Sequence, residues 1–363
     1  MVTETAVAST AALAADSSPR VSRGRAIVML VLVNVFWGLS FPVTKTINLE
    51  VDDRFMVAAA DSSTALRLAA ASWLTFCRFS LAALMFAVLF HRELRRSGPA
   101  EWKAGAWIGS FFFVGLMLQI IALATISASR GGFLTSLVAV YTPLITALLL
   151  FRLPARRIVA GVLVAMLGVA ILTELVELGP GLRIASGAAG RWTAGDTLTT
   201  LAALFFTGQI MLVDHFGRRL DAAAMTPGMF VSAAALALVT FLVVRPLVPE
   251  HAATGWIQMT LQPRFYLLVA CLSMLSTVLS LHWMNTYQHH VTASQAGIIY
   301  TLEPVFASLA AMFLPGMLTV LVGVQYQNER VVLPLVLGGG LIVSANLISL
   351  YPRRKGKLGK HKN

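Results

Sequence analysis

Ten long apolar stretches constrain this sequence more than any other feature. A helix that crosses the hydrocarbon core of a bilayer needs roughly 20 mostly apolar residues. Ten segments meet this requirement, at about 26–45, 70–90, 104–126, 131–151, 157–174, 197–214, 227–246, 265–286, 293–316 and 331–350. Only 12% of the residues are charged, against about 25% in soluble domains. We therefore predict an all-α membrane protein with ten transmembrane helices.

The basic residues are distributed unevenly around these segments. The formal net charge is +12, but the lysines and arginines form short clusters between apolar runs, which suits loops that face anionic lipid headgroups better than nucleic acid. If the N-terminus lies inside the cell, 18 of the 28 basic residues fall on the cytoplasmic side and 9 on the opposite side. This bias predicts a multi-pass protein of the inner (plasma) membrane with both termini in the cytoplasm.

The two ends of the chain read as tails. Residues 1–25 are predicted to be a disordered cytoplasmic tail, because no apolar run of the signal-peptide kind precedes Arg20. Residues 351–363 are predicted to be a basic cytoplasmic tail. The two cysteines, Cys77 and Cys271, both lie inside apolar runs, which favours packing over a disulfide.

The longer connections are all predicted on the outer side, at about 46–69, 175–196, 247–264 and 317–330, and they carry most of the acidic loop residues. The inner connections are short and basic.

An internal repeat divides the chain. Ala128–Thr135 resembles Ala293–Tyr300 at an offset of 165 residues, and a proline, Pro143 or Pro304, follows in each copy. Five spans per copy is an odd number, so the second copy must enter the membrane from the opposite side. We therefore predict two inverted five-helix repeats at 26–175 and 196–350, an arrangement typical of secondary transporters.

Five short motifs occur in order along the chain: Phe36-Trp37-Gly38-Leu39-Ser40-Phe41, Arg78-Phe79, Ser127-Ala128-Ser129-Arg130-Gly131-Gly132-Phe133-Leu134-Thr135, Gly195-Asp196 and Leu302-Glu303-Pro304-Val305-Phe306-Ala307. Together they resemble the drug/metabolite transporter superfamily, in particular its EamA-type ten-helix permeases. The sequence departs from that pattern after the fourth span, where Phe151-Arg152-Leu153-Pro154 replaces a frequent Gly-Glu-Arg. A similar Asn328-Glu329-Arg330 follows the ninth span only after an extra stretch.

The resemblance implies a permease that moves a small metabolite, such as an amino acid or an amphipathic solute, by alternating access; similar proteins are often exporters. The residues add that no nucleotide-binding motif is present and that no nucleophile–base pair or metal cluster has the spacing of an enzyme. We therefore predict no enzyme activity, no cofactor and no nucleic-acid partner. The alternative is a non-transporting membrane scaffold or sensor with extracytoplasmic loops.

Glu303 is the strongest candidate site residue. It lies about ten residues into the predicted ninth span, roughly 15 Å deep at 1.5 Å per residue. A charged carboxylate at that depth needs a partner, water or a proton. It is a proton- or cation-coupling group, a partner for a substrate amine, or part of a structural Glu-Pro hinge. Pro304 is predicted to kink the helix and leave the Tyr300 carbonyl open; Pro143 is the corresponding hinge candidate.

Other candidates are polar or aromatic. Arg78 either grips an anionic group or Glu303, or plays a structural role and extends towards the interface. His282, Asn285 and Gln288 recur at intervals of three in the eighth span, and the first two are favoured as cavity-lining groups.

Three further side chains complete the predicted site. Trp37 and Tyr300 are candidate walls of a cavity, and Gln119 is a candidate polar contact whose alternative role is helix packing. His289 and His290 alone do not predict a metal site. The small residues near Gly168 and Gly338 predict a close helix contact, either within the chain or in a homodimer.

Overall fold

The structure is a computed structural model that describes residues 22–55, 63–151, 153–178, 182–184, 192–248, 255–291, 296 and 299–350. The predicted tails, apart from residues 22–25, lie outside these ranges. The described elements are α2 (Arg23–Arg54), α3 (Thr64–Leu89), α4 (His91–Arg96), α5 (Pro99–Thr125), α6 (Ala128–Thr135), α7 (Val138–Leu149), α8 (Arg156–Leu172), β1 (Val176–Leu178), β2 (Leu182–Ile184), α9 (Ala194–Gly217), α10 (Thr226–Val244), η2 (Arg245–Leu247), α12 (Gly255–Thr260), α13 (Pro263–Cys271), η3 (Leu272–Leu279), α14 (Ser280–Tyr287), η4 (Gln288–His290), α16 (Glu303–Val322) and α17 (Leu333–Leu350).

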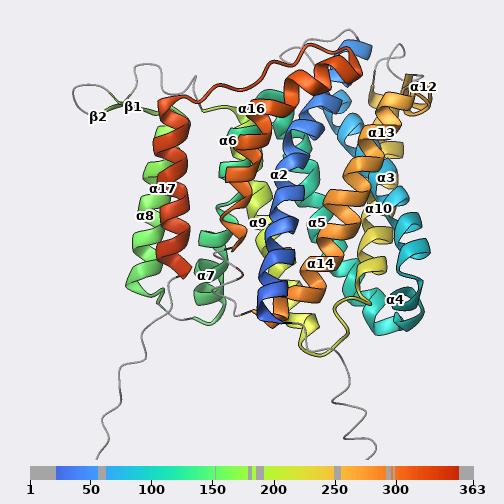
Figure 1. Cartoon of the computed structure of the whole chain (residues 1–363), viewed down its shortest axis with the longest axis horizontal. Coiled ribbons are helices and arrows are strands. Elements are labelled where there is room, and N and C mark those ends of the chain that lie inside the picture. The colour runs from blue at the N-terminus through green and yellow to red at the C-terminus, as the bar shows by residue number, and fades with distance from the viewer. Residues whose placement is uncertain are drawn as a thin grey trace, which may run out of the picture.

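The long helices stand side by side as a bundle (Figure 1). Many leucine, valine and phenylalanine side chains on their outer faces are exposed, among them Phe313 at 69% and Val320 at 88%. Such a surface would be unstable in water and is the one that hydrocarbon solvates. The bundle is therefore built for a bilayer.

Eight of the described helical segments are long and apolar enough to cross a membrane, judged by length and composition. The fifth and tenth predicted spans correspond to α8 and α17, which are shorter at 17 and 18 residues. These two helices pack against each other at one side of the bundle (Figure 1). The count of ten spans therefore stays a prediction.

Small residues bring α8 and α17 together. A methyl group added at Gly168 would lie 2.8 Å from the carbonyl oxygen of Gly338, and one added at Gly161 would lie 2.0 Å from the hydroxyl of Ser349. The sequence left open whether these glycines form a contact within the chain or in a homodimer. In the structure they lie in a contact within the chain.

The first helix is longer than its sequence predicts. The expected outer loop began at residue 46, but α2 continues to Arg54. The acidic residues that suggested a loop, Glu50 and Asp52, are buried in the helix and form ion pairs with Arg264 and Arg67 at 3.4 and 2.5 Å. Distant basic partners therefore allow the helix to continue through an acidic stretch.

The fourth predicted span is two helices. A turn at Ser136 and Leu137 separates α6 from α7. In the ninth predicted span a turn at Thr301 and Leu302 immediately precedes α16. The two breaks are 165 residues apart, which is the offset of the sequence repeat.

The eighth predicted span contains a π-helix, η3, between α13 and α14. Its wider turns are accompanied by side-chain hydroxyls that bond the carbonyl five residues back: Thr277 donates to Leu272 at 3.2 Å and Ser280 to Leu275 at 2.7 Å. Short π-helical segments are frequent at functional sites.

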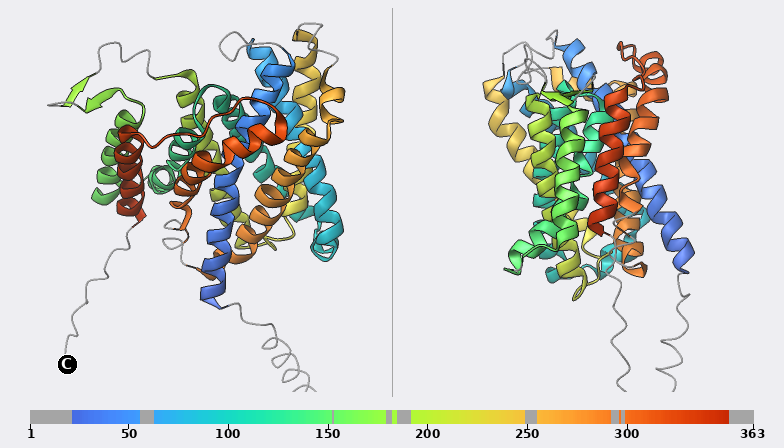
Figure 2. Two further views of the ribbon diagram at one scale, coloured as in Figure 1. Left: turned by 45° about the horizontal axis from the view of Figure 1, so that its top comes forward. Right: turned by 90° about the vertical axis from the view of Figure 1, so that its left-hand side faces the viewer.

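Two predicted outer loops contain structure of their own. Between α8 and α9 the strands β1 and β2 pair antiparallel, and this hairpin projects from the end of the bundle (Figure 2). The short helix α12 lies between α10 and α13. The described fold is therefore helical apart from this hairpin.

Gly38 permits the closest helix contact near the centre of the bundle. A methyl group there would lie 2.7 Å from the backbone nitrogen of Ala307 and from the Cβ of Phe306, so α2 and α16 approach each other directly. Bulkier residues would separate the two helices and disturb the side chains beside the contact.

We expect Gly38→Ala to destabilise the protein by about 1–3 kcal/mol, because overpacking a tight contact forces backbone shifts. Gly340→Ala in α17 is the matched control, since nothing lies within 4 Å of the added methyl group. Thermal unfolding in detergent measures both variants. Equal melting temperatures would contradict the close α2–α16 contact.

Candidate functional site

A cavity of about 1030 Å³ lies between the helices and is lined from both halves of the chain. Helices α2, α3, α5, α7, α8 and α9 contribute side chains, as do η3, η4 and the start of α16. Its polar lining residues are Ser40, Arg78, Gln119, Thr135, Ser136, Thr142, Thr146, Arg157, Gln209, Asp214, His215, Arg218, Ser276, Gln288, Tyr300, Glu303 and Ser349. The volume is at the upper end of the range for small-molecule sites.

One end of the cavity is open. Asp214 and Arg218, near the end of α9, line it with side chains that are 61% and 74% exposed. Leu153, in the connection after α7, also lines it and is 96% exposed. The end of α9 that carries Asp214 and Arg218 is at the end of the bundle where α2 begins and α17 ends (Figure 1), so the mouth lies at this end.

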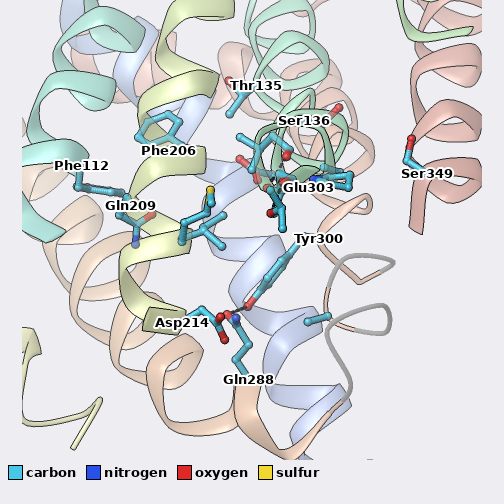
Figure 3. A pocket seen from close by; sticks show the side chains of 18 of the residues that line it. Phe112, Thr135, Ser136, Phe206, Gln209, Asp214, Gln288, Tyr300, Glu303 and Ser349 are labelled. Carbon is cyan, nitrogen blue, oxygen red and sulfur yellow. Dashed lines mark hydrogen bonds between the residues drawn. The ribbon is translucent and has the colours of Figure 1, made fainter. Parts of the chain in front are cut away.

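Glu303 is the first residue of α16 and lines the cavity (Figure 3). Within the described part of the chain, its carboxylate has no hydrogen-bond donor or basic partner, so it remains available to solvent or a ligand. Pro304 stands in the first turn of α16, directly after the turn at Thr301 and Leu302 that interrupts the predicted span. A proline there removes no helical hydrogen bond and favours the start of a helix.

Two aromatic residues form a wall close to Glu303. Tyr300 donates a hydrogen bond from its hydroxyl to the side-chain oxygen of Gln288 at 2.8 Å (Figure 3). The rings of Trp37 and Tyr300 lie 5.9 Å apart, centre to centre. The predicted aromatic pair, from the two sequence motifs, thus meets in the cavity.

Arg78 reaches the same cavity from the middle of α3. The residue is only 4% exposed and does not extend to the surface. Its Nε donates to the hydroxyl of Thr277 at 2.7 Å, and the hydroxyl of Ser273 donates to its backbone carbonyl at 2.9 Å. The π-helix η3 therefore holds both the side chain and the backbone of this arginine.

His282, Asn285 and Gln288, the polar residues predicted on one face of the eighth span, contact three different surroundings. The ring of His282 lies 4.1 Å from that of Phe90, and Asn285 donates to the hydroxyl of Thr226 at 3.0 Å. Only Gln288 lines the cavity. Each three-residue step falls about 60° short of a whole number of turns, so the first and last members face different neighbours.

The glutamines contribute more than helix packing. Gln119 lines the cavity and donates to the hydroxyl of Thr135 at 3.0 Å, and Gln209 lines it from α9. Pro143 also lines the cavity. Tyr141 instead borders a separate apolar pocket of about 370 Å³ that involves α7, α8 and α9.

Several lining residues were missed in the sequence. Thr142 and Thr146 lie one turn apart on α7, and this spacing was the available signal. Asp214 is the last residue of the predicted sixth span, and no motif singled it out there. Ser276 and Thr277 carried no motif, and their importance depends on the π-helix.

The opposite end of the cavity is closed by polar contacts around α6, which we call the seal. Arg130 binds Asp196 through two contacts of 2.6 Å, and Asp196 is fully buried at the start of α9. The carboxylate of Glu329 accepts hydrogen bonds from the first backbone amides of α6, those of Ala128 and Ser129, at 2.7 and 3.2 Å.

Lys45 completes the seal from α2. Its ammonium group donates to the carbonyls of Leu123, at 3.3 Å, and Ile126 at the end of α5. The two ion pairs of Glu50 and Asp52 lie further along the same helix. Five parts of the chain are therefore tied together at this end, whereas the other end of the cavity is open.

Comparisons with known proteins found a transporter family, a relative and a similar fold. Residues 24–174 match the EamA-like transporter family. An uncharacterized transporter of Archaeoglobus fulgidus is 26% identical over 304 residues, which make up 84% of this chain and 82% of that protein. A crystal structure with 17% identity has a TM-score of 0.51 and covers 90% of this chain and 97% of its own, which is a likeness of fold.

We expect Asp196→Asn to weaken the seal, because removing one member of a buried ion pair costs about 3–5 kcal/mol. Asp214→Asn is the control: its partner is Arg218, both side chains are exposed, and such pairs contribute about 0–1 kcal/mol. Melting temperatures in detergent compare the two. If Asp196→Asn lowers the melting temperature no more than Asp214→Asn does, the Arg130–Asp196 pair does not stabilise the seal.

Proposed function

We propose that this chain, a multi-pass membrane protein that is similar to transporters of the drug/metabolite superfamily, is a secondary transporter of a small metabolite. Members of its EamA-like family are transporters and not enzymes. The proposed substrates are amino acids or other amphipathic solutes, and the proposed mechanism is alternating access.

One observation carries the proposal: a large cavity is open at one end and closed by the seal at the other. A transporter needs such an asymmetric state, because a cavity open at both ends would leak. The helix breaks at Ser136 and Thr301 support the proposal of inverted repeats, since secondary transporters often place interrupted helices at their site.

The orientation follows from charge. The bias of 18 basic residues to 9 favours an inner (plasma) membrane topology with both termini in the cytoplasm. The described chain begins and ends at the same end of the bundle, which is the end with the cavity mouth (Figure 1). The cavity would then open to the cytoplasm, ready to load a solute for export.

Glu303 is the proposed coupling group. Within the described residues it lacks a basic partner inside the cavity, and no nucleotide-binding motif in the sequence offers another energy source. A proton or a cation that binds this carboxylate would change the charge of the cavity and bias the opening of the seal.

The alternative function is a scaffold or sensor, which the hairpin β1–β2 and the helix α12 favour as elements for an outer partner. A scaffold needs no water-accessible cavity of this size. Transport into liposomes by the purified protein distinguishes the two. Comparing metabolites in cells with and without the protein would supply the substrate.

Once a substrate is known, Glu303→Gln should lower its transport about tenfold or more, because a lost contact to a charged group is worth about 1.5–3 kcal/mol. Asp214→Asn is the matched control, an acid of the same cavity that already has a partner. Insertion and folding should be unchanged in both. Full activity of Glu303→Gln would exclude the coupling role.

Cysteine labelling tests the orientation. In a background that lacks Cys77 and Cys271, Gln258→Cys on α12 should react with an impermeant maleimide in intact cells, because it is exposed at the sealed end. Arg218→Cys at the mouth should react only after the membrane is opened. Labelling of both from the same side would refute the topology.

A further inference from the structure

We propose that Arg78 is an anion-binding subsite of the central cavity and that the transported molecule carries a carboxylate or a similarly compact anionic group. The inference rests on the proposed function and names the substrate class of the same cavity. Its basis is an arginine that is buried, fixed in position and only partly bonded by the protein.

The guanidinium group has unused bonding capacity. An arginine side chain carries five N–H donors, and in the described structure Nε–H is the one that has a protein acceptor, Thr277 at 2.7 Å. The remaining donors, on the two terminal nitrogens, face no acceptor among the described residues. The residue is 4% exposed and borders the cavity, so these donors can be satisfied only from within it.

No carboxylate in the described part of the chain neutralises this charge. The described acidic residues form their ion pairs elsewhere: Asp52 with Arg67, Asp196 with Arg130, Asp214 with Arg218 and Glu50 with Arg264. Glu303 lines the same cavity but does not pair with Arg78. A buried cation without a partner is unfavourable, and an anionic ligand would relieve that cost.

The π-helix η3 fixes the direction of the free donors. The hydroxyl of Thr277 donates its proton to the carbonyl of Leu272 and therefore presents a lone pair to Nε of Arg78. In the same π-helix, Ser276 donates to the carbonyl of Phe36 at 2.8 Å, next to Trp37. Thr277 is thus a positioning residue that aims the planar guanidinium fork, the geometry that binds a carboxylate through two bonds.

The rest of the lining indicates an organic anion. Phe112, Leu116 and Phe206 line the cavity with Trp37 and Tyr300, and this apolar surface suits a hydrocarbon or aromatic body. Inorganic phosphate or sulfate would leave that surface without a partner. We therefore expect a monoanion with an apolar part, and Glu303 remains free for a second, cationic group where the substrate has one.

A matched pair of probes tests the subsite on the purified full-length chain in detergent. Phenylacetate and phenylacetamide have nearly the same shape, but only the first is an anion at neutral pH. Binding is measured by the change in tryptophan fluorescence and by the shift in melting temperature. The intact protein should bind phenylacetate about tenfold more tightly than phenylacetamide, a factor typical of one charge-assisted contact.

Substitutions test whether the preference for phenylacetate comes from Arg78. Arg78→Gln should abolish the preference for the anion, and Arg78→Lys should keep a weaker preference because charge remains without the fork. Thr277→Val should weaken phenylacetate binding, whereas Thr277→Ser keeps the acceptor and should restore it. Arg157→Gln is the control: it removes the same charge from an exposed position that also lines the cavity.

The outcomes separate the subsite from the proposed function. Equal binding of the two probes by the intact protein, or an equal loss of preference in Arg157→Gln and Arg78→Gln, would overturn the subsite whether or not the protein transports. If Arg78→Gln fails to fold, the comparison of Thr277→Val with Thr277→Ser decides. Anion binding without transport in liposomes would leave the subsite standing and refute the transporter.

Discussion

The rest of the structure depends on one constraint: polar groups inside a bilayer must find their partners within the protein. Long helices satisfy the hydrogen-bonding groups of their own backbone, so they form the shell that faces the lipid. The interruptions at Ser136 and Thr301 occur where the chain borders the cavity or packs inside the bundle. Arg78 obeys the same rule through the hydroxyl of Thr277, and its remaining donors are left to the cavity.

The two ends of the cavity carry similar charged side chains but differ in how deeply these are buried. At the sealed end, Arg130, Asp196 and Glu329 are directed at each other or at helix ends, and distant segments become one unit. At the mouth, Asp214 and Arg218 pair in water, where the bond is weak and the side chains can part. The burial of an ion pair, more than the types of residue in it, decides which end of the cavity stays closed.

Much of the helical arrangement was predictable, because apolar length and motif order are local properties of the sequence. Trp37, Tyr300 and Glu303 meet at the cavity as the motifs suggested. The sequence could not reveal that α2 passes its acidic stretch, since Glu50 depends on an arginine more than 200 residues away. For the same reason His282 was misjudged: its neighbours on other helices set its role, and periodicity does not name them.

The helix α6 joins the two ends of this arrangement. Its first amides are held by Glu329, while its last residue, Thr135, touches Gln119 in the cavity wall. Eight residues make a rigid rod about 12 Å long, and the turn at Ser136 gives it a pivot. A ligand that displaces Thr135 would therefore also move the backbone amides of α6 that Glu329 binds. Binding in the cavity would then reach the seal through this one short helix.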